Sequence, residues 1–166
     1  CSRPRRDRFP LPSSDMALDD ELLNKVTWKI PNALALIGSR AGDERNGMTT
    51  SWITQLSMEP VLIGVGVDNS AVTHRLISEG GCFTVNFWDA DDTRVFVKFS
   101  KPAEYSDGAL NGRSVHEATT GAPVFDEAIA WVDCVVSWET VVRGGSVHIP
   151  ISRLSKPMIE KSWGRL

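Results

Sequence analysis

The chain has 166 residues and a mass of 18.3 kDa, which suits one domain with a buried core. Hydrophobic residues make up 42% and charged residues 23%, a composition that excludes a disordered chain. The net charge of -3 argues against non-specific nucleic-acid binding, and no apolar run is long enough to cross a bilayer. We therefore expect neither a nucleic-acid partner nor a membrane partner.

Residues 1–15 differ in composition from the rest, with four arginines and three prolines among them. They lack the apolar segment of a signal peptide, so we predict a disordered leader or a non-native extension. Residues 16–166 are expected to form a single domain. Cys1, Cys82 and Cys134 show no metal-ligand spacing, so we expect no metal site. The last two are predicted to be small buried residues of a cytoplasmic protein.

The first half of the chain predicts one helix followed by strands. The helix has acidic residues at its start, where the helix dipole favours them. Asn46-Gly47 is the strongest turn signal and is expected to close a hairpin. The expected elements are a helix over 18–26, a strand over 33–39, a polar turn over 41–47, and strands over 48–54 and 61–67.

The second half predicts two further helices and several strands. The strand over 82–88 alternates apolar and polar residues, and the strand over 128–142 is long enough to need a bend. The other expected elements are a helix over 70–78 capped by Asn69 or Ser70 and ended by Gly80-Gly81, a helix over 91–99, loops over 102–121, and a strand over 147–151. Beyond Arg153 no element is predicted.

Together these elements predict a mainly β fold with flanking helices, built as a small closed or split β-barrel. The chain has no dinucleotide-binding glycine motif and no P-loop. Asp133 and Glu139 are an even number of residues apart on one long strand, and we expect both to be solvated charges on one face. His116 is expected to be a loop histidine.

Two clusters rich in hydroxyl groups stand on either side of the strand expected at 61–67. The first runs from Asn46 to Trp52 and the second from Asn69 to His74. Buried Ser and Thr need hydrogen-bond partners, so core packing explains these clusters poorly. An anionic, partly planar ligand suits them better, and the pattern predicts a flavin phosphate site.

At the phosphate, Ser70 and Thr73 would supply hydroxyl groups beside the free N–H groups and the dipole of a helix start. His74 and Arg75 would add positive charge, and a guanidinium suits phosphate oxygens well. The alternative is that Ser70 only caps the helix and that His74 lies on the surface.

The order of several motifs resembles a known family. These motifs are Asn46 to Trp52, Ser57 to Leu62, Asn69 to His74, Phe83 to Asn86, Gly121 to Val124 and Ala130 to Cys134. Together they are similar to the flavin-reductase-like, FMN-binding split-barrel proteins. The resemblance covers roughly residues 26–139. It implies a Greek-key-like split barrel, a homodimer, bound FMN or the related FAD, and NAD(P)H as hydride donor.

The resemblance also implies which residues contact the flavin. Backbone groups of Thr50, Ser51 and Trp52 would serve the polar edge of the ring, and the Trp52 side chain would either wall the ring or pack in the core. Lys98-Phe99-Ser100 resembles a stretch that touches the cofactor in relatives, with simple packing of Phe99 as the alternative. The cofactor-binding residues expected are Thr49, Thr50, Ser51, Trp52, Ser57, Asn69, Ser70, Thr73, His74, Arg75 and Phe99.

One segment departs from the family pattern. Relatives carry Gly-Asp-His after the long strand, whereas this chain reads Gly144-Gly145-Ser146-Val147-His148. The displaced His148 is the one candidate catalytic residue, near the nicotinamide donor. The strands that usually follow are expected to be missing, which would leave a barrel edge for a partner chain to cover.

Three functions follow from these observations. The first is an NAD(P)H:flavin oxidoreductase that supplies reduced flavin or electrons to a monooxygenase or another acceptor. The second is a flavoredoxin-like electron carrier that holds FMN tightly and does not use NAD(P)H. The third is a non-enzymatic ligand-binding protein with the same barrel.

Overall fold

The computed structural model describes residues 20–141 and 147–158, and the side chains of residues 21–137. The chain divides into two compact units, residues 1–31 and residues 32–166. In the first unit, α1 (Asp20–Thr27) confirms the helix expected at 18–26 over its described part. Lys25 and Glu21 form an i,i+4 ion pair of 2.6 Å on this helix.

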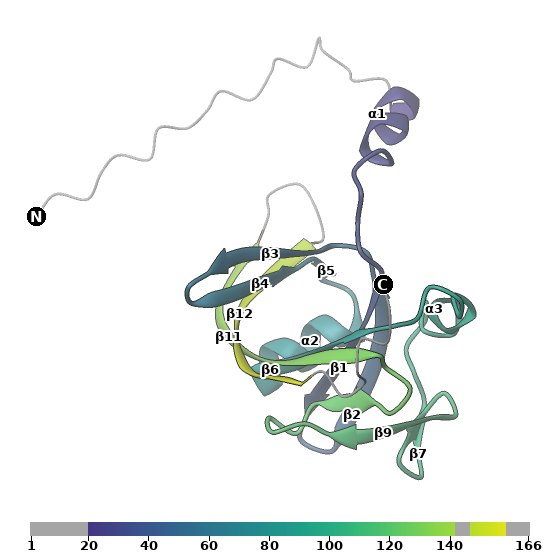
Figure 1. The fold of residues 1–166 in the computed structure, drawn as a ribbon, viewed down its shortest axis with the longest axis vertical. Coiled ribbons are helices and arrows are strands. Elements are labelled where there is room, and N and C mark those ends of the chain that lie inside the picture. The colour runs from purple at the N-terminus through teal and green to yellow at the C-terminus, as the bar shows by residue number, and fades with distance from the viewer. Residues whose placement is uncertain (1–19, 142–146, 159–166) are drawn as a thin grey trace, which may run out of the picture. The chain divides into compact units, whose positions relative to one another are not determined.

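The second unit is built around one large, curved antiparallel sheet (Figure 1). Its strand order is β2-β1-β6-β11-β12-β4-β3, with the short β5 paired to β12. Strands β4 and β6 are therefore separated by β11 and β12, a Greek-key-like order. The strands are β1 (Ala35–Ala41), β2 (Glu44–Thr50), β3 (Ile53–Met58), β4 (Val61–Val65), β5 (Val67–Asp68), β6 (Cys82–Phe87), β11 (Ala130–Val141) and β12 (Val147–Met158).

The concave face of this sheet carries the first core cluster. Alternation along β6 places Phe83 and Val85 on this face, as the sequence predicts, and they meet Ile37 of β1 and Cys134 of β11. Helix α2 (Val72–Gly80) lies inside the curve of the sheet and adds the buried Ile77 to this cluster (Figure 1). The sheet and the helix together form a split barrel.

Helix α2 ends where the glycines predict and begins later than expected. Gly81 is left-handed at φ 67° and its N–H bonds the carbonyl of Ile77, which closes the last turn. The N-cap is Ala71, and no side-chain cap bond is present there among the described residues. The prediction of Asn69 or Ser70 as the N-cap is therefore wrong, because the Ser70 hydroxyl bonds Asp68 instead.

A second, smaller sheet packs on the convex face. It has the order β10-β9-β8-β7, with β7 (Tyr105–Ser106), β8 (Ala109–Leu110), β9 (Arg113–Glu117) and β10 (Pro123–Phe125). Three of these strands lie within residues 102–121, where loops were expected. Helix α3 (Arg94–Lys98) precedes them. Leu36, Phe99, Leu110 and Phe125 form the buried cluster between the layers.

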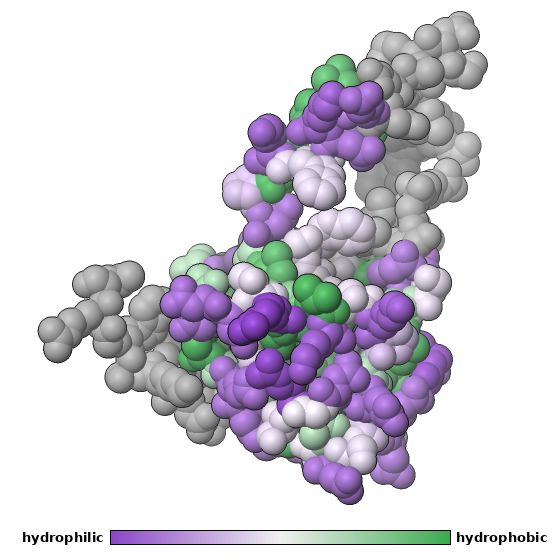
Figure 2. Space-filling model, turned by 90° about the vertical axis from the view of Figure 1, so that its right-hand side faces the viewer, coloured by the Kyte–Doolittle hydropathy of each residue, from purple (hydrophilic) through white to green (hydrophobic). Residues whose placement is uncertain are grey.

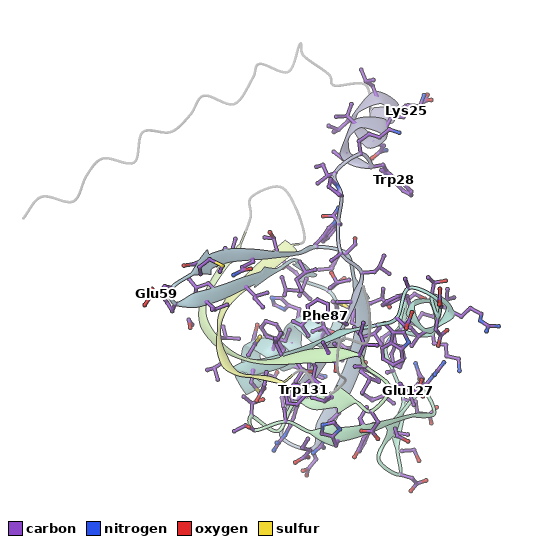
Figure 3. The ribbon with its side chains drawn as sticks, viewed as in Figure 1. Lys25, Trp28, Glu59, Phe87, Glu127 and Trp131 are labelled. Atoms are coloured by element: carbon purple, nitrogen blue, oxygen red, sulfur yellow. The ribbon has the colours of Figure 1, made fainter. Side chains whose placement is uncertain are left out.

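Polar side chains join the two layers. Thr84 donates to the carbonyl of Pro123, and Asn86 accepts the N–H of Phe125 at 3.1 Å. Asp133 accepts both the N–H of Thr120 at 3.0 Å and its hydroxyl at 2.6 Å. Figure 3 shows Phe87 and Trp131 on opposite sides of this part of the sheet.

Asp133 is fully buried, so the expectation of a solvated charge is wrong. The Glu139 side chain lies outside the described residues, and the pairing of β11 with β12 shifts register at Asp133/Cys134 and at Val136/Trp138. These bulges supply the bend that the strand length predicts. His116 lies on β9, not in a loop, and pairs with Asp126 at 2.6 Å.

The hairpin expected over residues 41–47 is confirmed, but Asn46-Gly47 does not form its turn. The hairpin between β1 and β2 turns at Gly42-Asp43, where Gly42 takes the left-handed φ of 55°, and Gly47 pairs with Gly38 inside the ladder. A Cβ on Gly47 would lie 2.9 Å from Cδ1 of Phe99 and 3.0 Å from Cζ of Phe125. Glycine is therefore needed at position 47 because a larger residue would clash with these two rings.

The segment after residue 146 is a strand of the barrel. β12 continues well past the expected end at residue 151 and pairs with both β11 and β4. The barrel edge that was expected to lack a strand is thus filled. In the part of the chain that is described, the two edges of the large sheet are β2 and β3.

The buried carboxylate gives the first testable prediction. Asp133→Asn places an amide N–H beside one of the two Thr120 donors, and we expect it to lower the free energy of unfolding by about 2 kcal/mol in urea denaturation. Glu79→Gln is the matched control, because the exposed Glu79 pairs with Arg75 at 3.4 Å and should change stability by less than about 0.5 kcal/mol. Equal stability of the two variants would contradict a structural role for Asp133.

Candidate functional site

A cavity of about 250 Å³ lies where three chain segments meet. Strand β2 contributes Asn46 and Met48, which share one face because they are two residues apart. The start of α2 and the segment that follows α3 supply the rest of the wall. The other lining residues are Ser70, Ala71, Val72, Thr73, Phe99, Ser100, Lys101 and Pro102. The two hydroxyl-rich clusters singled out in the sequence therefore do converge in space.

Asn46 connects all three segments. Its side chain is buried, with 3% exposed. Its Nδ2 donates to Oγ1 of Thr73 on α2 at 2.8 Å, and its Oδ1 accepts the N–H of Ala103 at 2.6 Å. One amide thus holds the helix start and the loop at fixed positions around the cavity.

The two hydroxyl groups predicted at the phosphate have different environments. Thr73 is buried and its oxygen accepts the bond from Asn46. Ser70 is exposed, and both its hydroxyl and its N–H donate to Oδ1 of Asp68, at 2.7 and 2.8 Å. These bonds, with the nearby His74, hold the pKa of Asp68 below its usual value, so its carboxylate is ionised at neutral pH.

Positive charge reaches the cavity from a residue that sequence reasoning missed. Lys101 lines the cavity, whereas Arg75 pairs with Glu44 at 2.5 Å and with Glu79 at 3.4 Å. The Glu44 carboxylate raises the pKa of Arg75. His74 is half-buried on α2.

The chain bends away from the cavity between β2 and β3. Oγ1 of Thr50 accepts the N–H of Trp52 at 3.1 Å, and the carbonyl of Trp52 accepts the N–H of Gly66 at 2.7 Å. This backbone bond ties the bend to the end of β4. The Trp52 side chain is 56% exposed, so it does not pack in the core. Ser51 is half-buried within the bend.

The remaining predicted residues lie away from the cavity or are used in packing. Thr49 points to the opposite face of β2, where its hydroxyl donates to the carbonyl of Phe96 at 2.7 Å. The ring of Phe99 is buried against Phe125, with centroids 5.0 Å apart. Ser57 lies near the tip of the β3–β4 hairpin and accepts the N–H of Glu59 at 3.3 Å, and Asn69 is exposed before α2.

His148 belongs to β12, and its backbone pairs with Val67, three residues before Ser70. Its side chain lies outside the described residues. The start of β12 therefore pairs with β5, which leads into the connection to α2.

A second cavity of about 330 Å³ opens among β3, β4, β6 and β11. Its lining is mainly apolar and includes Ile53, Val61, Ile63, Phe87 and Val132. The bend from Thr50 to Trp52 lies in the chain between the residues of the polar cavity and those of this apolar one.

The chemistry of the polar cavity suits a phosphate group. It offers a buried hydroxyl, the N–H groups at the start of α2, and one lysine.

No group of three or more His, Cys, Asp or Glu side chains that could hold a metal ion occurs among the described residues. Cys82 and Cys134 are buried free thiols, as predicted, and burial raises the pKa of Cys134 to about 12.

The surface around α3 is polar and charged, with apolar residues confined to small patches (Figure 2). No helix within residues 20–141 and 147–158 has the length and apolar character needed to cross a bilayer.

Comparison with known proteins gives consistent matches. The family model described as the flavin reductase like domain matches residues 28–154. The flavin reductase of Pseudomonas putida is 23% identical over 145 residues, which are 87% of this chain and 82% of that protein. Diflavin flavoprotein A 1 of Synechocystis sp. is 25% identical over 119 residues, which are 71% of this chain and 21% of that protein. The chain thus spans about a fifth of the diflavin flavoproteins that it matches.

Solved structures share the fold. The flavin reductase HpaC, complexed with NADP+, aligns with a TM-score of 0.73 at 20% identity, over 86% of this chain and 88% of that one. This likeness confirms the split-barrel fold expected from the sequence.

Proposed function

The chain belongs to the flavin reductase like domain family, and from this membership we propose that it binds FMN and accepts hydride from NADH or NADPH. The observation that carries the proposal is the convergence of Asn46, Thr73 and Lys101 around one cavity, in a domain that has a second, mainly apolar cavity. A flavin mononucleotide has a single phosphate and a flat ring, which match these two surfaces in size and polarity.

The residues have separate roles in this proposal. Thr73, Ser100 and Lys101 bind the phosphate with the first N–H groups of α2. The backbone of Thr50, Ser51 and Trp52 orients the polar edge of the ring, and the exposed Trp52 side chain helps to exclude water from it. When bound, FMN supplies the hydride-accepting and electron-transferring chemistry. The protein then needs to bind the flavin, orient its ring and shield it from water. Hydride transfer itself needs no acid–base side chain.

The donor site is proposed at the start of β12. The His148 backbone pairs with Val67 next to the β5–α2 connection, so this strand approaches the proposed flavin site. NADP+ bound to HpaC supports a nicotinamide donor in this fold. The altered segment around His148 favours, as second candidate, a flavoredoxin-like carrier that holds FMN and does not use NAD(P)H.

A visible spectrum tests the proposal and separates these candidates. We expect purified protein mixed with FMN to show a bound-flavin band that bleaches when NADH or NADPH is added anaerobically. Free FMN at the same concentration is the control for direct reduction. A bound flavin inert to both nucleotides would favour the carrier, and failure to quench FMN fluorescence would contradict flavin binding altogether.

Lys101 gives a matched pair of variants at the phosphate. Lys101→Ala removes the cation that lines the cavity and should weaken FMN binding about 5- to 10-fold in a fluorescence titration. Lys98→Ala removes another exposed lysine, one that does not line the cavity, and should leave the dissociation constant unchanged. Equal effects of the two variants would show that general charge, and not the cavity, attracts the ligand.

We propose that the protein is a homodimer that passes reduced flavin or electrons to a monooxygenase or another acceptor. Strand β3 is an edge of the sheet, and it carries the exposed Leu56 and Met58, which are 49% and 77% accessible. An apolar edge strand is a favourable surface for pairing with a second copy.

Light scattering tests the dimer. At micromolar concentration we expect twice the chain mass of 18.3 kDa. Met58→Glu should shift the mass toward the monomer, because it places a charge on the proposed apolar interface. Val97→Glu, on the exposed face of α3 at 75% accessibility, is the control and should leave the mass unchanged.

A further inference from the structure

We propose that Asn46 is a positioning residue that orients the hydroxyl of Thr73 as a hydrogen-bond donor to the flavin phosphate. The inference rests on the proposed function, because it assigns a role at the same cavity. It ranks two hydroxyl groups that the sequence alone treats as equal.

The backbone fixes the orientation of the Asn46 amide. The N–H of Ala103 can only donate, and it lies 2.6 Å from one end of this amide. That end must be the carbonyl oxygen. The opposite end, which faces Oγ1 of Thr73 at 2.8 Å, must then be the NH₂ group.

This orientation determines what Thr73 can do. Its oxygen accepts a hydrogen bond from the Asn46 amide, so its own hydrogen must point elsewhere. The described residues give Oγ1 of Thr73 no other hydrogen bond, and the side chain lines the cavity although it is 99% buried. A buried hydroxyl whose proton lacks an acceptor is a donor prepared for an anion.

The hydroxyl of Ser70, in contrast, is not available to a phosphate. Its hydroxyl already donates to the ionised carboxylate of Asp68 at 2.7 Å. A phosphate would have to break this charge-assisted bond to use the Ser70 proton, and it would gain little from the exchange. The phosphate is therefore recognised through Thr73, with Asn46 behind it, and not through Ser70.

Titrations with FMN and riboflavin test the assignment, because riboflavin lacks the phosphate. The readout is the ratio of the two dissociation constants, measured by flavin fluorescence for folded protein checked by circular dichroism. The variants are Asn46→Asp, Thr73→Val, Thr73→Ser, Ser70→Ala, and Asn46→Asp combined with Thr73→Val. Asn46→Asp keeps an acceptor for Ala103, but its second oxygen draws the Thr73 proton away from the cavity.

We expect wild-type protein and Thr73→Ser to prefer FMN over riboflavin. Asn46→Asp and Thr73→Val should each reduce this preference about 10-fold, and Ser70→Ala by less than about 3-fold. Asn46→Asp should have a clearly smaller effect in the Thr73→Val background. Repulsion between the new carboxylate and the phosphate would act in both backgrounds, whereas a reoriented Thr73 hydroxyl can act only where Thr73 is present.

Several results would overturn the inference alone. These are wild-type protein that binds both flavins equally, a Ser70→Ala loss as large as that of Thr73→Val, or an Asn46→Asp effect that is the same in both backgrounds. Wild-type protein that binds neither flavin would overturn the proposed function as well. If Asn46→Asp does not fold, the comparison of Thr73→Val, Thr73→Ser and Ser70→Ala still decides which hydroxyl binds the phosphate.

Discussion

The position of the cavity depends on hydrogen bonds between buried side chains of the large sheet and the backbone of residues 120–125. Asn86 accepts the N–H of Phe125, whose ring lies edge-on to Phe99 at 5.0 Å. The carbonyl of Phe99 in turn accepts the N–H of Thr49, on the edge strand β2, at 3.0 Å. Ser100 and Lys101 follow directly in the chain. The polar contact between the layers therefore fixes where the lysine of the cavity lies.

Strand β2 connects this packing to the site because its two faces have different partners. Thr49 faces the convex side and holds α3 through the carbonyl of Phe96, in the middle of that helix. Asn46 faces the concave side and holds both α2 and the loop at Ala103. An edge strand also has backbone groups free for contacts outside the sheet, and the N–H of Thr49 uses this freedom to bond the carbonyl of Phe99. The side chains of Asn46 and Thr49 make the other contacts that join the three segments around β2.

Much of the fold could be predicted from the sequence, where periodicity is strong. The alternation of β6, the glycines at the end of α2 and the length of β11 all gave correct elements. Strands β7 and β8 have two residues each, too few for any period to show. Asp133 was misplaced because a buried carboxylate depends on a loop partner, Thr120, that no local pattern reveals.

The site was predictable in outline but not in detail. The hydroxyl clusters do meet, as their spacing around the strand at β4 indicates. Residue type alone could not show that Arg75 is held by two glutamates or that Ser70 is engaged with Asp68. Lys101 lies in a segment without periodicity, so only its place two residues after Phe99 could have indicated it. The hydrogen bonds and ion pairs that side chains make with one another in the folded protein decide which polar groups are available to a ligand.

Gly47 shows how a missing side chain sets a dimension of the molecule. Rings of two phenylalanines rest directly on its backbone, with no room for a methyl group between them. The two rings therefore pack directly against the backbone of β2 at this point. Any side chain here would push against Phe99, which is followed directly by Ser100 and Lys101 of the cavity wall. The absence of a side chain at Gly47 therefore sets how closely this part of the wall approaches β2.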